Sequence, residues 1–166
     1  MRVLFRTENL RRFFILLSGL WVGGFSAVGF VVAPVLFSAL GDRQVAGMVA
    51  GHLFKIIASS SVSLSVVLMI LANLLVGRGL QWFRLIRWIL LVMLTFSFAE
   101  AFVIIPWMDS LRDEALGVGM SIMESSWAHL FMVLHQISSL IFIAQSILGV
   151  ALIWRATQSE VFRGQS

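Results

Sequence analysis

Residues 13–40 read FFILLSGLWVGGFSAVGFVVAPVLFSAL and contain no ionisable side chain. About 20 apolar residues are enough to cross the ~30 Å hydrocarbon layer of a bilayer, so this run predicts a transmembrane helix. Gly19, Gly23 and Ala27 recur at four-residue spacing, which leaves one face of the helix nearly bare and lets another helix approach closely. We therefore expect this helix to be the packing hub of a bundle, and the same three residues could also serve a homo-oligomer.

The composition of the chain is that of a membrane protein. Of its 166 residues, 60% are hydrophobic and only 12% are charged, whereas a soluble chain has about 25% charged residues. Almost all of this length is needed for membrane-spanning helices, so we predict a single domain over residues 1–166. Cysteine is absent, which excludes disulfides, thiolate metal ligands and thiol nucleophiles.

Three further apolar runs follow the first. The four predicted spans are about 13–40, 56–76, 85–108 and 127–154. Residues 44–55 form an amphipathic lead-in that continues into the second span, and residues 109–126 form a polar loop that could include a short surface helix. A basic segment before an apolar run can mark a signal peptide, but the first run is longer than the about 7–15 residues of a signal sequence, so we predict an uncleaved span.

The basic residues are unevenly divided between the connecting segments. Nine of the twelve fall in the N-terminal segment, the turn after the second span and the C-terminal tail: Arg2, Arg6, Arg11, Arg12, Arg78, Arg84, Arg87, Arg155 and Arg163. The opposite side carries the other three: Arg43, Lys55 and Arg112. By the positive-inside rule, both termini are expected to be cytoplasmic.

Together these features predict an all-α, multi-pass four-helix transmembrane bundle. Its expected surroundings are the lipid bilayer, and its expected location is the bacterial cytoplasmic (inner) membrane. The pI near 11.4 reflects topology and contact with anionic lipid, so no nucleic-acid partner is expected. No segment identifies a protein partner.

Glu100 is the clearest ionisable residue within a span. It lies about eight residues from the outer end of the third span, or ~12 Å deep at 1.5 Å per residue. Such residues are costly in a membrane and mark functional sites by default, and an unpaired carboxylate at this depth is expected to be protonated. A structural hydrogen bond, or an ion pair with Lys55 or Arg43, is the alternative.

The last span carries a polar stripe. At 100° per residue, six side chains fall within an arc of about 120°: His129, Met132, His135, Gln136, Ser139 and Ser146. We expect this stripe to face protein or water rather than lipid, with His135 at the depth of Glu100. A second polar face runs along the lead-in and second span: Met48, His52, Lys55, Ser59 and Asn73.

Metal or haem binding is one interpretation of this outer-side cluster. Histidine with methionine suits copper, and histidines from different helices could ligate the iron of haem b. The candidate copper ligands are His52, Met48, His135 and Met132. The candidate haem ligands are His52, His135 and His129.

Two other interpretations remain open. Glu100 and His135 could form a proton relay or a gate for a small solute. Alternatively, the intramembrane polar residues only fix helix register or support a partner-binding scaffold: Glu100, Lys55, Asn73 and Gln136. The chain has no nucleotide-binding glycine loop, no paired carboxylates and no serine with a visible base partner, so we do not expect a hydrolase and favour a non-enzymatic protein.

Five blocks of the sequence are distinctive: GLWVG at 19–23, VAPVLF at 32–37, AG at 46–47, GHLF at 51–54 and LHQIS at 134–138. They resemble the transmembrane protein 205-like family, a domain-of-unknown-function group of small membrane proteins. The resemblance implies four spans and no established reaction. A remoter likeness to CopD-type copper-resistance membrane proteins, and to a haem-binding protoporphyrinogen-oxidising family, implies that His135 and His52 are the ligands to test. The chain has Phe142 where the family usually has asparagine.

Overall fold

The computed structural model describes residues 2–158, and every regular element in this range is helical. The elements are α1 (Arg2–Ala27), η1 (Val28–Val32), α2 (Ala33–Ala39), α3 (Arg43–Gly77), α4 (Phe83–Ala99), η2 (Glu100–Ile104), α5 (Ile105–Gly117), η3 (Ile122–Glu124) and α6 (Ala128–Thr157). Four helical stretches within the described range are long and apolar enough to cross a membrane: Thr7–Ala39, Arg43–Gly77, Phe83–Gly117 and Ala128–Thr157. The prediction of an all-α fold with four membrane-length helices is confirmed.

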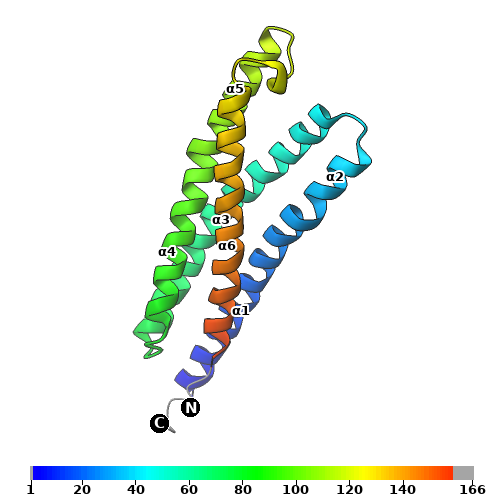
Figure 1. Ribbon diagram of the computed structural model, residues 1–166. Helices are drawn as coiled ribbons and strands as arrows, with labels where there is room; N and C mark the ends of the chain where they lie inside the picture. The colour runs from blue at the N-terminus through cyan, green and yellow to red at the C-terminus, as the bar shows by residue number, and fades with distance from the viewer. Residues whose placement is uncertain (1, 159–166) are drawn as a thin grey trace.

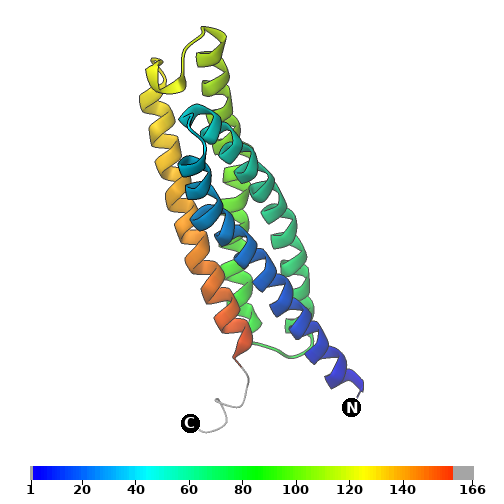
Figure 2. The same cartoon turned by 90° about the vertical axis from the view of Figure 1, so that its right-hand side faces the viewer.

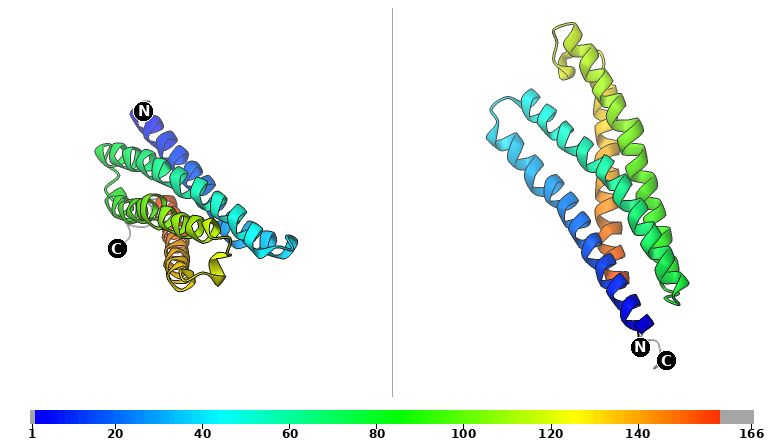
Figure 3. Two further views of the ribbon diagram at one scale, coloured as in Figure 1. Left: turned by 90° about the horizontal axis from the view of Figure 1, so that it is seen from above. Right: turned by 180° about the vertical axis from the view of Figure 1, so that it is seen from behind.

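The four stretches form two helical hairpins. The first hairpin consists of α1, η1, α2 and α3, and the second consists of α4, η2, α5 and α6. The start of α1, the α3–α4 turn and the end of α6 lie at one end, here called the basic end. The connections after α2 and α5 lie at the opposite end, here called the loop end (Figures 1 and 2). The hairpins pack together near the basic end and diverge toward the loop end (Figure 1; Figure 3, right).

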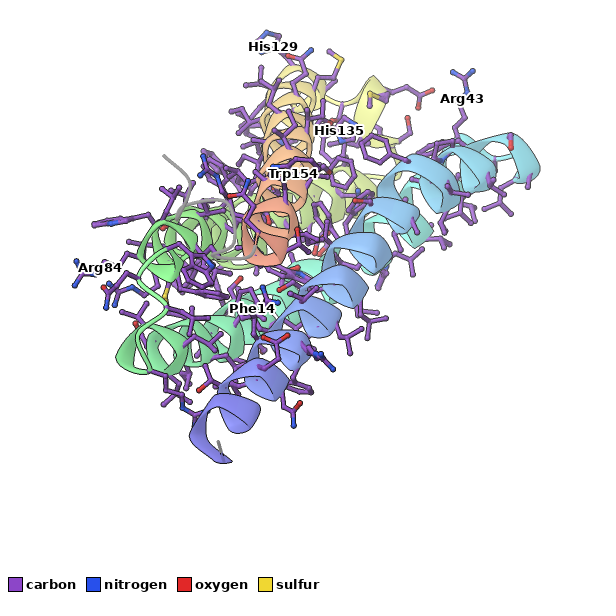
Figure 4. The ribbon with its side chains drawn as sticks, turned by 90° about the horizontal axis from the view of Figure 1, so that it is seen from below. Phe14, Arg43, Arg84, His129, His135 and Trp154 are labelled. Carbon is purple, nitrogen blue, oxygen red and sulfur yellow. The ribbon has the colours of Figure 1, made fainter. Side chains whose placement is uncertain are left out.

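The main apolar core lies in the half of the bundle nearer the basic end. Its large, fully buried side chains come from all four stretches: Phe14, Leu68, Leu75, Phe83, Ile86, Leu90 and Leu152. The rings of Phe14 and Phe83 meet edge to face with their centroids 5.2 Å apart, and Figure 4 shows Phe14 turned into the bundle. This packing holds the two hairpins together on the basic side of the bundle.

Two helices pass a proline without ending. Proline lacks an N–H, and its ring clashes with the preceding turn of an α-helix. Wider π turns, η1 and η2, precede Pro34 and Pro106, and there the backbone bonds run from Ala33 to Val28 and from Ile105 to Glu100. The third stretch therefore continues as helix to Gly117. The sequence instead predicts that the span ends at Met108 and that a polar loop follows.

The second stretch begins as the sequence predicts. The Asp42 side chain caps α3 by accepting hydrogen bonds from the backbone N–H groups of Gln44 and Val45, at 2.7 and 3.3 Å. From this cap, α3 runs without interruption to Gly77. The amphipathic lead-in at 44–55 is therefore part of one helix with the second span.

The small-residue face of the first helix does not pack inside the bundle. A Cβ atom built on Gly19 or Gly23 would meet nothing within 4 Å, and Ala27 is exposed. The expectation that these residues form the internal packing hub is wrong, because α1 buries its opposite face, with Trp21 and Val22 turned inward. The homo-oligomer contact predicted for the small-residue face stays a prediction.

Candidate functional site

The candidate site is centred on Glu100, the first residue of the π turn η2. Its side chain is only 8% exposed. One carboxyl oxygen, Oε2, accepts a hydrogen bond of 3.0 Å from the Ser138 hydroxyl of α6. The other, Oε1, is buried and has no hydrogen-bond partner among the residues that the structure describes. A buried carboxyl oxygen without a partner is unusual, because most buried polar atoms in proteins are hydrogen-bonded.

A small cavity adjoins this carboxyl group. Its volume is about 30 Å³, which is room for about one or two water molecules. Four lining side chains are polar, and they come from the second, third and fourth stretches: Ser61, Glu100, Ser138 and Gln145. The rest of the lining is apolar: Phe25, Phe54, Ile57, Ala58 and Phe142.

Two more buried hydrogen bonds lie close to this cavity. The Trp21 indole N–H donates to the Ser61 hydroxyl at 2.9 Å, and the Ser97 hydroxyl donates to Gln145 Oε1 at 3.3 Å. With the bond from Ser138 to Glu100, they form a polar layer of six residues: Trp21, Ser61, Ser97, Glu100, Ser138 and Gln145. Each of these three bonds joins two helices of the same hairpin.

An aromatic cluster lines the cavity where the last helix meets the first hairpin. The Phe142 ring of α6 lies 4.6 Å from the Phe25 ring, 5.0 Å from Phe30 and 6.1 Å from Phe54, measured between centroids. A Cβ atom on Gly29 would collide with the Phe142 ring, so the ring lies directly against the backbone of η1. The Phe142 side chain thus forms part of the cavity wall.

The histidines predicted as ligands lie outside the polar layer. His52, His129 and His135 are all exposed, and Figure 4 shows His129 and His135 leaving α6 in different directions. His52 Nδ1 lies 2.9 Å from the backbone oxygen of Met48, one turn earlier on the same helix. Within residues 7–158, no three side chains of His, Asp and Glu come together in a way that could hold a metal ion.

The polar stripe on the last helix is on the outside of the bundle. Five of its six members are exposed: His129, Met132, His135, Gln136 and Ser139. The stripe therefore does not pack against the other helices of the described chain, and the other half of the expectation, that it faces water rather than lipid, stays a prediction. The buried face of α6 instead carries Leu134, Gln145 and Gly149. Gln145 accepts a hydrogen bond from Ser97 of α4, and Gly149 allows close contact with α1.

The alternative expected for Glu100 is a structural hydrogen bond or an ion pair with Lys55 or Arg43, and among the described residues the hydrogen bond forms and the ion pair does not. Lys55 Nζ lies 3.1 Å from Asp109 Oδ2, and Asp109 accepts from Arg112 as well. Arg43 is exposed at the start of α3 and points away from the bundle (Figure 4). Glu100 is bonded to a neutral hydroxyl instead.

Asn73, the remaining intramembrane candidate, lies on α3 about three turns beyond Ser61, the residue of α3 that lines the cavity next to Glu100. Its side-chain oxygen accepts a hydrogen bond of 2.9 Å from Arg87, near the basic end.

Sequence reasoning missed most of the polar layer. Ser138 and Gln145 were overlooked because a single serine or glutamine in a span is weak evidence of a site. Their spacing of seven residues, continued by Gly149, places them on one face of α6 and was a usable signal. Trp21 was the second signal, because an indole N–H far from both ends of a span needs a buried acceptor.

Comparison with known proteins gives a family and no activity. A model of a domain of unknown function, DUF4149, matches residues 16–116, which extend from α1 into α5 and include Glu100. No curated protein and no solved structure matches the chain. The likeness to the transmembrane protein 205-like and CopD-type families stays a prediction.

Proposed function

The chain belongs to the DUF4149 family, whose function is unknown, and we propose that it is an integral-membrane protein that carries protons through the carboxyl group of Glu100. The observation that carries this proposal is the buried carboxyl oxygen Oε1, which borders a small polar cavity and has no partner in residues 7–158. Buried ionisable groups between membrane helices are typical of proton relays and ion pathways.

The charge balance of the site supports this proposal. A buried carboxylate without a counter-charge is costly, and uptake of a proton removes the charge. Lys55, one of the two cationic groups that the sequence suggested as a partner, is paired with Asp109, and so is Arg112. Water in the adjoining cavity would bring the proton to Glu100 or accept it.

The breaks in the helices support a site whose access to water changes when the hairpins move. Transporters often place their binding site between repeated helical units, next to helices that are broken near the middle of the membrane. Here each hairpin begins with a helix that contains a π turn and a proline, and Glu100 is the first residue of the second π turn. We propose that the hairpins move relative to each other about η1 and η2, so that Glu100 gains access to water from the loop end.

The charges support one orientation in the membrane. The exposed Arg84 and Arg155 lie near the basic end with Trp154, and Figure 4 shows Arg84 pointing away from the bundle. Basic residues favour the cytoplasmic side, and tryptophan favours the membrane interface. We therefore propose that the basic end is cytoplasmic and that the protein resides in a bacterial inner membrane.

Proton flux into liposomes tests the proposed function. The purified protein is reconstituted with a pH-sensitive dye inside, and a potassium gradient with valinomycin drives protons inward. We expect the wild-type protein to acidify the lumen and Glu100→Gln to reduce the rate to that of protein-free liposomes, since the amide keeps the shape of the side chain and cannot release a proton. The matched control is Glu124→Gln, an exposed carboxylate at the loop end. Flux that survives in Glu100→Gln would refute the proposal.

Cross-linking tests the hairpin movement. The chain has no native cysteine, so Lys55→Cys with Asp109→Cys places a clean thiol pair across the two hairpins at the loop end. A short bis-maleimide should bridge this pair and stop proton flux, while each single variant treated in the same way should keep it. If the bridged protein conducts normally, separation of the hairpins is not part of the pathway.

The same preparation tests the metal and haem interpretation. A Soret band that disappears in His135→Ala would indicate haem, and stoichiometric copper that disappears in His52→Ala or Met48→Ala would indicate copper. Either result, together with absent proton flux, would replace the present proposal. The exposed positions of the three histidines favour Glu100 over both alternatives.

A further inference from the structure

We infer that the cavity beside Glu100 binds a sodium ion in competition with the proton. This inference rests on the proposed function, because it uses the same carboxyl group as the exchanging site. One sodium ion entering the site would release one proton from Glu100, so the charge of the site would be unchanged.

The donor atoms of the cavity are those that a hard cation requires. Ser61, Ser138 and Gln145 offer hydroxyl or amide oxygens, and Glu100 offers the unpartnered oxygen Oε1. Among the residues that the structure describes, no imidazole and no thioether lines the cavity. Hard cations such as sodium, magnesium and calcium take oxygen ligands, whereas copper and zinc prefer nitrogen and sulfur.

The charge of the site selects a monovalent ion. Glu100 is the single carboxylate among the lining residues. A monovalent cation would neutralise it, whereas a divalent cation would leave a net positive charge in a weakly polar environment, which is costly. Magnesium and calcium sites in proteins usually have several carboxylates or retain several waters, and this cavity has neither the charge nor the space.

The small volume of the cavity also favours a single small ion. A volume of about 30 Å³ accommodates one ion or about one or two waters. The Phe142 ring and its aromatic neighbours line the cavity where the last helix meets the first hairpin. An organic solute therefore does not fit beside Glu100 in this conformation.

The helix break changes the backbone bonding one residue along the chain from Glu100, at Ala101, which is not among the residues that line the cavity. In the π turn, the N–H of Ile105 bonds to the carbonyl of Glu100. The next carbonyl, that of Ala101, would bond to residue 106 in the same pattern, but Pro106 has no N–H. Carbonyls released in this way at helix breaks coordinate sodium in membrane transporters.

Binding of radioactive sodium to the purified protein tests the inference. In scintillation proximity measurements with ²²Na⁺, we expect saturable binding that weakens as the pH is lowered, because protons compete for Glu100. Glu100→Gln should abolish binding, and Gln145→Leu or Ser138→Ala should weaken it about 10- to 100-fold, as for losses around other metal sites. Glu124→Gln should bind as the wild type does. Size-exclusion profiles establish that each variant is folded, and Glu100→Asp, which keeps the charge, should retain pH-dependent binding.

Several outcomes would overturn the inference. Absence of saturable sodium binding by the wild type, or binding that persists in Glu100→Gln, would exclude this site. Equal displacement of ²²Na⁺ by magnesium would overturn the choice of a monovalent ion, and equal displacement by potassium would overturn the choice of a small one. Proton flux that depends on Glu100 without any sodium binding would remove this inference and leave the proposed function intact. Sodium binding that depends on Glu100 without proton flux would remove the proposed proton transport and leave the sodium site intact.

Discussion

The contact between Gly149 and Val22 gives the sharpest test of how the two hairpins pack. Gly149 lies on the buried face of α6, directly against Val22 of α1. We expect Gly149→Ala to destabilise the protein, although alanine is normally the better helix former. The matched control is Gly23→Ala, a glycine one residue from Val22 on the outward face of α1.

The magnitude follows from the distances. A Cβ atom at Gly149 would lie 2.7 and 2.8 Å from the two methyl carbons of Val22, whereas carbon atoms in favourable contact are about 3.5–4.0 Å apart. Val22 is 6% exposed, and its β-branched side chain has few alternative rotamers, so the helices themselves must separate. Overpacking of this kind costs about 1–3 kcal/mol.

The control removes the contribution of helix propensity. Replacing glycine by alanine within a helix is worth about 1 kcal/mol, and this gain is common to both substitutions. The difference between Gly149→Ala and Gly23→Ala therefore isolates the collision with Val22. For a chain of this length, about 1–3 kcal/mol corresponds to a difference of about 2–12 °C in Tm.

Thermal unfolding in mild detergent, followed by tryptophan fluorescence, measures this difference. We expect Gly23→Ala to unfold at or slightly above the wild-type temperature, and Gly149→Ala to unfold at a lower temperature than either. Equal Tm values for the two variants would show that α6 and α1 do not approach as closely as described. A lower Tm for Gly23→Ala, with a change in its elution volume, would show that the small-residue face of α1 is covered by a second molecule.

Four further substitutions test the polar contacts. Ser138→Ala leaves Glu100 Oε2 without its hydroxyl donor, and we expect the free energy of unfolding, measured by SDS titration, to fall by about 1–3 kcal/mol. Trp21→Phe removes the indole donor of Ser61 and should lower the same quantity by about 0.5–1.5 kcal/mol; adding Ser61→Ala should then have less effect than it has alone. Asp109→Asn weakens two partly exposed ion pairs at the loop end, so its cost should stay below about 1 kcal/mol and diminish in high salt. A salt-independent loss of several kcal/mol would show that this ion pair is buried in the native protein.

The length and polarity of the chain were sufficient to predict the number of helices and their class. A helix must satisfy its own backbone within the bilayer, so long apolar runs have essentially one available structure. Proline was less informative, because the sequence does not reveal whether a helix ends at Pro106 or widens into a π turn. In this protein the helix widens, and the polar segment after it becomes part of α5.

The face that each helix buries could not be predicted in the same way. In water, apolar residues turn inward and polar residues outward, whereas a lipid tail is as apolar as a leucine side chain. Burial in a membrane therefore follows close packing, which is why α6 buries Gly149 and Gln145 and leaves His135 exposed. Glu100 was predictable because a carboxyl group is costly anywhere in lipid. Its partner Ser138 was recognisable only through its spacing to Gln145 and Gly149, because a lone serine is tolerated on either face.

The distribution of the buried hydrogen bonds connects the fold to the proposed mechanism. Trp21 and Ser61 bond within the first hairpin, while Ser138 bonds to Glu100 within the second. The ion pair between Lys55 and Asp109, which does cross between the hairpins, is partly exposed, and exposed pairs contribute little to stability. Separation of the hairpins at the loop end would therefore break contacts of Phe142 with the first hairpin but no hydrogen bond of the polar layer. In the proposed mechanism, the hairpins therefore separate by giving up apolar contacts, and water entering from the loop end reaches Glu100 while its bond to Ser138 stays intact.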